Sequence, residues 1–217
     1  TWLKENLFGN TEVLNVSENY AQVALQGPLA QIILQKVTEK DLNEIEFYYF
    51  SDNVKIGSIE ALVSRTGYTG EDGFEIYFDS TKAEEMWDML LETGKDSGLM
   101  PAGLGSRDTL RFEASLPLYG HELDEDITPL EAGLGFCVKL GKDNFIGKEA
   151  LVNQKAEGLK RKLVGFEMID RGIPRSNYEV YAEGRKIGYV TTGSFSPTLK
   201  KNIGLALIDS SYAKEGT

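Results

Sequence analysis

Three glycines, a tyrosine and a carboxylate lie close together in one stretch of the sequence, an arrangement that could bind a flat, polar small molecule. Gly67, Gly70 and Gly73 recur at every third position. Glycine can adopt a positive φ and lets a ligand or another backbone approach closely. Tyr68 lies within this run and Glu75 follows it. The stretch predicts the rim of a small-molecule site; the ordinary alternative is a hairpin loop with a solvated glutamate.

Two predicted strands flank this glycine run and must position the carboxylate. Apolar and other residues alternate over residues 59–63 and again over residues 74–78. A period of two places the apolar side chains on one face of a strand. Glu75 therefore points away from the face that Phe74 and Ile76 bury.

A second candidate site lies in residues 101–114, which predict a helix entered through a glycine-rich loop. Arg107 and Arg111 are one helical turn apart and share a side of this helix. Arg107 lies near the positive end of the helix dipole, where a cation favours anion binding. The alternative is a solvated charge network that joins the two arginines to Asp108 and Glu113.

An aromatic segment precedes the glycine run. Residues 47–50 read Phe-Tyr-Tyr-Phe and predict a strand with rings on both faces, covered on both sides. Tyr48 or Tyr49 could line a pocket, or both could be core residues.

Two further segments have a predicted structural role. The acidic residues of 119–126 predict a solvated loop, because they lack the spacing of a calcium-binding loop. Residues 131–140 predict a strand with Phe136 and Val138 pointing inward. The apolar run over residues 136–138 separately predicts that the Cys137 thiol is buried and inert.

Composition excludes several classes of function. The formal net charge of −11 disfavours nucleic acid and anionic membrane surfaces as partners. No apolar run is long enough for a membrane helix. Cys137 is the only cysteine and His121 the only histidine, so a disulfide, a cysteine or multi-histidine metal site and a Ser-His-Asp triad have little to be built from.

The fold class predicted is α+β, with antiparallel sheets and packed helices, followed by a small C-terminal β-barrel. The composition changes near residues 141–147, after which short strands alternate with Gly, Pro, Asn and Ser turns. We therefore expect one region over residues 1–142 and an incomplete barrel over residues 143–217.

Four motifs in order resemble those of the glycine cleavage system T-protein family, the aminomethyltransferases. They cover residues 67–76 (GYTGEDGFEI), 106–120 (SRDTLRFEASLPLYG), 170–175 (DRGIPR) and 192–204 (TGSFSPTLKKNIG). Each motif alone is weak, but chance agreement of all four is remote.

The resemblance implies a tetrahydrofolate enzyme whose first region is the remainder of two folate-binding domains. Such enzymes take the aminomethyl group from the lipoylated H-protein and release ammonia and 5,10-methylenetetrahydrofolate. By matching, Glu75 binds the pterin edge and Arg107 shapes the folate site. Tyr68 and Tyr48 are rim aromatics, and Arg175 reaches the reacting end. The resemblance implies no metal, and a location in the bacterial cytoplasm or, in a eukaryote, the mitochondrial matrix.

The chain also departs from the family pattern. No segment matches the family's N-terminal region, which carries an aspartate thought to assist at the folate nitrogens, and the last barrel strands are absent. We therefore expect this chain alone to bind folate weakly and to turn over little or not at all.

Three alternatives to this enzyme remain open. The chain could be the folate-dependent C-terminal part of a dimethylglycine or sarcosine dehydrogenase, although those sequences usually vary the Gly-Glu-Asp-Gly core. It could be a folate-binding relative in iron–sulfur assembly, but Cys137 lacks that group's motif context. It could also be a non-catalytic folate-binding fragment.

Overall fold

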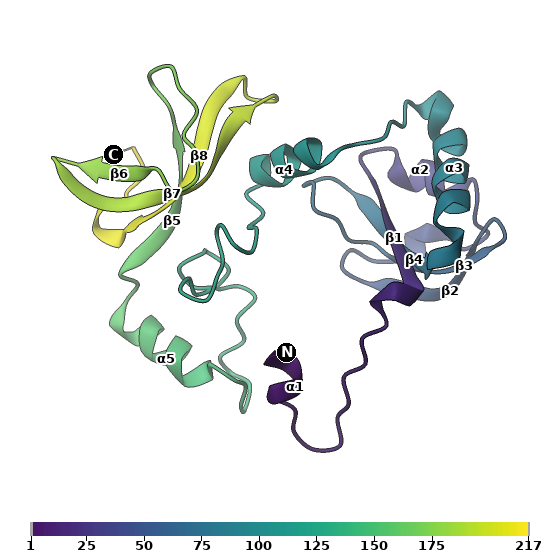
Figure 1. The fold of residues 1–217 in the computed structure, drawn as a ribbon, viewed down its shortest axis with the longest axis horizontal. Coiled ribbons are helices and arrows are strands. Elements are labelled where there is room, and N and C mark those ends of the chain that lie inside the picture. Colours follow the sequence, from purple (N-terminus) through teal and green to yellow (C-terminus); the bar gives the residue numbers. More distant parts are fainter. Residues whose placement is uncertain (1, 217) are drawn as a thin grey trace. The chain divides into compact units, whose positions relative to one another are not determined.

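A computed structural model describes residues 2–216, which form two compact units joined between Gly103 and Leu104 (Figure 1). Each unit contains a four-stranded sheet whose neighbouring strands are antiparallel. The α+β class with antiparallel sheets is therefore confirmed. Among the described helices, none has the length and apolar character needed to cross a membrane.

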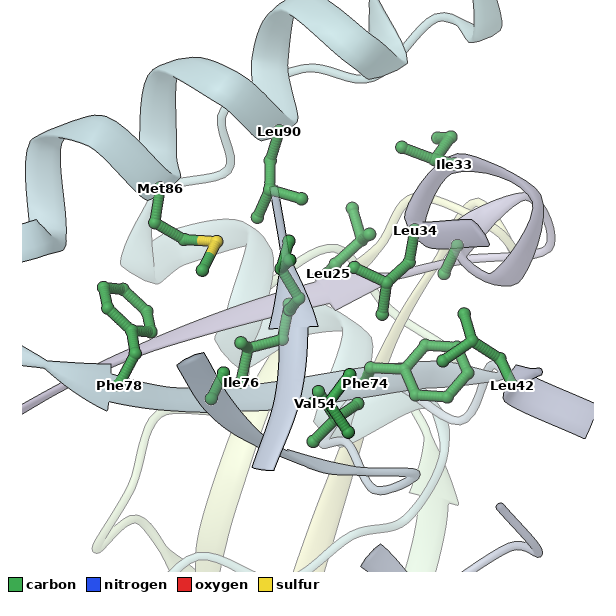
Figure 2. Close-up of a cluster of buried hydrophobic side chains, with 14 of the residues drawn as sticks. Leu25, Ile33, Leu34, Leu42, Val54, Phe74, Ile76, Phe78, Met86 and Leu90 are labelled. Atoms are coloured by element: carbon green, nitrogen blue, oxygen red, sulfur yellow. The ribbon is translucent and has the colours of Figure 1, made fainter. Parts of the chain in front are cut away.

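The first unit has the sheet order β1-β4-β3-β2. Its elements are α1 (Trp2–Glu5), β1 (Tyr20–Gln26), α2 (Ala30–Gln35), β2 (Phe50–Ile56), β3 (Ile59–Ser64), β4 (Gly73–Asp79) and α3 (Ala83–Gly94). The predicted alternation determines how this sheet packs. The side chains of Ile59, Ala61 and Val63 in β3 and of Phe74, Ile76 and Phe78 in β4 lie on one face and are buried. Figure 2 shows Phe78 and Ile76 of β4 beneath Met86 and Leu90 of α3, and Phe74 beneath Leu34 of α2.

The second unit has the sheet order β5-β8-β7-β6. Its elements are α4 (Leu104–Glu113), α5 (Lys148–Glu157), β5 (Arg161–Glu167), β6 (Glu179–Ala182), β7 (Arg185–Ser196) and β8 (Lys201–Asp209). Leu207 of β8 packs with Ile127 and Ala132 in a small buried cluster. The division of the chain into domains at residues 142 and 143 stays a prediction, although the compact units meet at residue 103.

The predicted aromatic strand over residues 47–50 is wrong. Phe47 and Tyr48 form a turn, Tyr48 has a φ of +70°, and β2 begins only at Phe50. All four rings are exposed, that of Tyr48 by 73%. The positive φ prevents an extended backbone here, and a run of four rings has no alternation to show which face would be buried.

The predicted strand over residues 131–140 is also wrong. Its backbone closes local turns, with the amides of Ala132 and Cys137 donating to carbonyls three or four residues earlier. Phe136 is exposed by 73% and Cys137 is exposed, so neither the inward ring nor the buried thiol is found. Gly133, with a φ of +78°, interrupts the extended conformation that the apolar composition indicated.

Candidate functional site

Glu75 lies on the open face of the first sheet, as the alternation predicts. It pairs across the sheet with Ala24 of β1 and Ser64 of β3. Its carboxylate accepts a hydrogen bond of 2.5 Å from the Thr66 hydroxyl and one of 3.1 Å from the Gln22 amide. Two neutral donors therefore fix the orientation of a half-buried carboxylate.

Tyr77 lies two residues beyond Glu75, on the same face of β4. The Gln22 amide donates to the Tyr77 hydroxyl oxygen over 3.3 Å, which links the two side chains. Burial raises the pKa of Tyr77, and the negative charge of Glu75 raises it further. Tyr77 is therefore a neutral hydroxyl beside the carboxylate at neutral pH. Gln22 was not a predicted site residue, because only the strand register, which pairs it with Tyr77, shows that it adjoins Glu75. Tyr77 was not predicted either, although its alternation with Glu75 along the strand is a signal that could have found it.

The glycine run is used differently from the prediction. Of its three glycines only Gly70 has a positive φ, of +80°. A Cβ on Gly67 would lie 1.8 Å from Oε1 of Gln26, and one on Gly73 would lie 2.6 Å from the same amide group. The Gln26 amide donates to the carbonyls of Thr66 and Phe74. The close approach that two of these glycines allow is therefore made by a side chain of β1.

An ion pair anchors the two ends of the loop that carries the half-buried Tyr68. The Arg65 guanidinium contacts the Asp72 carboxylate at 2.6 and 2.9 Å and lies 5.4 Å from the centre of the Phe74 ring. Its hydrogen bond, outweighing the effect of burial, lowers the pKa of Asp72. The loop beside Glu75 is therefore fixed at its base.

Tyr48 lies at the same end of the sheet. Its amide donates to the carbonyl of Arg65, and the Arg65 amide donates back to the carbonyl of Tyr49. Ser64, the residue before Arg65, is the cross-strand neighbour of Glu75. Three predicted site residues, at positions 48, 68 and 75, thus belong to one end of the first unit.

Arg107 and Arg175 belong to the second unit, and both are exposed. Arg107 lies in the N-terminal half of α4, where the sequence predicts it. Arg175 lies in the loop before β6. Whether these arginines and Glu75 face one ligand stays a prediction.

Arg111 is neither an anion-binding residue nor part of a solvated network. It is only 1% exposed and pairs with Glu122 at 2.7 Å and with Asp108 at 2.8 Å. The Thr192 hydroxyl accepts from Arg111 over 3.2 Å and donates to Glu122 over 2.6 Å. Glu122, expected in a solvated loop, is fully buried.

The protonation state of Glu122 depends on these contacts. Burial acts to raise the pKa of this carboxyl group, but the hydrogen bonds from Thr192, Thr191 and the Leu118 amide, with the charge of Arg111, lower it overall. Glu122 is therefore ionised at neutral pH. No local pattern in the sequence indicates this pair. Its members are eleven residues apart, and Thr192 of β7 forms hydrogen bonds with both.

Of the four family-like motifs, three lie in the second unit, and strand β7 brings these three together. Glu113, two residues after Arg111, accepts hydrogen bonds from the hydroxyl groups of Ser196 and Thr198 at 2.5 and 2.6 Å. At Gly193 the chain passes against the segment before Arg175, and a Cβ there would lie 1.8 Å from the carbonyl oxygen of Pro174.

Gly193→Ala is expected to displace the loop that carries Arg175. Because the overlapping atom is backbone, the added methyl group should reduce the free energy of unfolding by about 1–3 kcal/mol. Chemical denaturation measures this loss, and Gly165→Ala in β5 of the same sheet is the matched control, since the nearest atom to the Cβ position there belongs to Leu205 and is 4.0 Å away. Equal stability of Gly193→Ala and the native chain would contradict the close contact.

An α+β unit with a polar sheet face, followed by a second unit built on an antiparallel sheet, places the chain among multidomain α+β proteins. A family model described as the GCVT N-terminal domain matches residues 1–142, and one described as the glycine cleavage T-protein C-terminal barrel domain matches residues 161–217. The chain belongs to the glycine cleavage T-protein family.

Curated relatives named aminomethyltransferase are similar over nearly the whole chain. The identity is 67% over 216 residues for the protein of Caldanaerobacter subterraneus subsp. tengcongensis, covering 99% of this chain and 58% of the relative. It is 63% over 217 residues for that of Alkaliphilus oremlandii, covering 100% of this chain and 59% of the relative.

A solved structure has the same fold. The crystal structure of glycine cleavage system aminomethyltransferase T from Bartonella henselae superposes with a TM-score of 0.81 at 31% identity, over 91% of this chain and 54% of that one. The chain therefore spans between 54% and 59% of the length of these three relatives. These matches favour the T-protein interpretation over its dehydrogenase and iron–sulfur alternatives.

Proposed function

We propose that this chain contributes to a tetrahydrofolate-dependent aminomethyl transfer in the glycine cleavage system. One observation carries the proposal: 67% identity to a curated aminomethyltransferase over almost every residue of the chain. The donor is the aminomethyl group on the dihydrolipoyl arm of the H-protein, and the products are ammonia and 5,10-methylenetetrahydrofolate. The bacterial origin of the relatives supports a cytoplasmic location.

Glu75 is the proposed ligand of the pterin edge. A pterin presents adjacent N–H donors, which a carboxylate can accept through two charge-assisted hydrogen bonds. Each Glu75 oxygen already accepts one bond, from Thr66 or Gln22. A carboxylate has about four acceptor positions, so Glu75 keeps capacity beyond these two bonds and its contact with the Tyr77 hydroxyl. The residues present therefore fit a donor edge of this kind.

The remaining proposed residues match the other parts of the substrate. The exposed ring of Tyr48 and the ring of Tyr68 offer surfaces on which a pterin plane can stack. Arg107 and Arg175 supply the positive charge that an anionic glutamate tail requires. The proposed chemistry needs no nucleophilic side chain, because the chain's contribution is to orient the folate nitrogens toward the aminomethyl carbon.

Glu75→Ala is expected to weaken tetrahydrofolate binding. Losing two hydrogen bonds to a charged acceptor should raise the Kd about 100-fold or more. Calorimetric titration of the chain with tetrahydrofolate measures this. The matched control is Glu60→Ala, which removes an exposed carboxylate from the same face of the neighbouring strand β3. Equal Kd values for Glu75→Ala and the native chain, with both folded, would place the pterin elsewhere.

A second assay tests the reaction itself. A protein of full family length that carries these residues should release ammonia from aminomethylated H-protein only when tetrahydrofolate is present. Oxidation of dimethylglycine in place of this reaction would contradict the proposal and restore the dehydrogenase alternative.

A further inference from the structure

We propose that Glu122 and Thr192 act as positioning residues for Arg107, by fixing helix α4 at its C-terminal end. The inference rests on the proposed function, which gives Arg107 its role in folate binding. Neither positioning residue is proposed to touch the substrate.

Helix α4 is buried at one end only. Arg111 and Phe112, in its last turn, are 1% and 3% exposed. Residues 104–108, which include Arg107, are all exposed, and Leu104 is 85% exposed. The buried contacts of α4 within the second unit are therefore concentrated in its last turn.

The first attachment is a closed set of three polar groups. Arg111 donates to Glu122, Thr192 donates to the same carboxylate, and Arg111 also donates to the Thr192 hydroxyl. The Leu118 amide donates to Glu122 over 3.0 Å, so the carboxylate is itself fixed to the backbone. Every side chain in this set is at most 5% exposed. Buried charged hydrogen bonds of this kind have little freedom to rearrange.

The second attachment follows one residue after Phe112. Glu113 accepts from the hydroxyl groups of Ser196 and Thr198 and from the Thr198 amide. Arg111 and Glu113 thus bind β7 and the turn after it at separate points. Two separated attachments fix both the position and the rotation of a helix about its axis, whereas one would leave the rotation free.

The consequence for Arg107 is geometric. Arg107 lies one turn from Arg111, so a rotation of the last turn carries its side chain around the helix axis. A small displacement of a binding group can cost a large factor in productive geometry.

The experiment compares Glu122→Gln, Thr192→Val and Arg107→Ala by calorimetric titration of the chain with tetrahydrofolate. Each positioning variant is expected to raise the Kd about five- to tenfold, which is less than complete loss of Arg107. Hydrogen exchange of the α4 amides should become faster in both. Glu167→Gln is the matched control, since its ion pair with Lys201 lies in the same unit and both side chains are more than half exposed; it should change neither quantity.

The double variant Arg107→Ala/Glu122→Gln separates positioning from general destabilisation. If Glu122 acts through Arg107, the double variant should bind no more weakly than Arg107→Ala alone. The inference would be overturned if the two substitutions multiplied the Kd, so that the double variant bound more weakly than Arg107→Ala alone. Glu122 would then act by a route other than Arg107. Unchanged Kd in Thr192→Val would also overturn it, and this milder variant decides the case if Glu122→Gln does not fold. Unchanged Kd in Arg107→Ala would instead reject the role that the proposed function gives to Arg107, and the inference with it.

Discussion

Phe74→Ala is expected to reduce the free energy of unfolding of the first unit by about 3–5 kcal/mol. The ring is fully buried, and Figure 2 shows it in the sheet-side layer of the cluster near Leu34 and Leu42. Its removal loses the transfer free energy of the ring and leaves a cavity that a closely packed core fills only in part. The guanidinium of Arg65 also loses the aromatic face that it contacts.

Chemical denaturation followed by circular dichroism measures this loss. The matched control is Phe50→Ala, a ring of the same size in the same sheet that is 64% exposed, which should cost much less. Similar losses for the two variants would mean that the buried cluster does not carry the stability of the unit. Because Phe74 adjoins Glu75, we also expect weaker tetrahydrofolate binding in the variant.

Arg111→Met is expected to reduce the stability of the second unit by about 3–5 kcal/mol, because it leaves the carboxylate of Glu122 buried without its cation. The control Lys201→Met breaks an exposed pair, where a loss of about 0–1 kcal/mol is normal. Adding Glu122→Leu to Arg111→Met should recover much of the stability, since an apolar pair often replaces a buried ion pair at no net cost. Failure of that recovery would contradict the explanation by an uncompensated charge.

The effect of Arg111→Met should depend on pH in a defined direction. The pKa of Glu122 is lowered in the folded chain from its ordinary value of 4.5. A carboxyl group with a lowered pKa stabilises the folded state fully above the unfolded value, and this contribution is lost as the pH falls through the folded value. The difference between the native chain and the variant should therefore be largest above pH 4.5 and shrink in more acidic solution.

The sequence predicts those features that depend on local periodicity. The alternation over residues 59–63 and 74–78 predicts both strands and places Glu75 on the polar face, and α4 is found where its pattern indicates. Such patterns work because burial of one face selects the register.

The features that the sequence misses depend on long-range contacts or on single backbone torsions. The Arg111–Glu122 pair requires β7 as a third partner, and Gln26 fills the space at two glycines from a strand more than forty residues away. Tyr48 turns the backbone with one positive φ that its aromatic neighbours do not reveal. Composition therefore predicts a strand wherever apolar residues gather, including places where a torsion or a distant polar group decides otherwise.

The exposed thiol of Cys137 offers a practical handle on the protein. As the only cysteine in the chain, it can take one maleimide dye without any substitution. Both tryptophans, Trp2 and Trp87, lie in the other compact unit. Energy transfer from the indoles to an acceptor on Cys137 would report the separation of the units in solution, and its change on adding folate would record any closure between them.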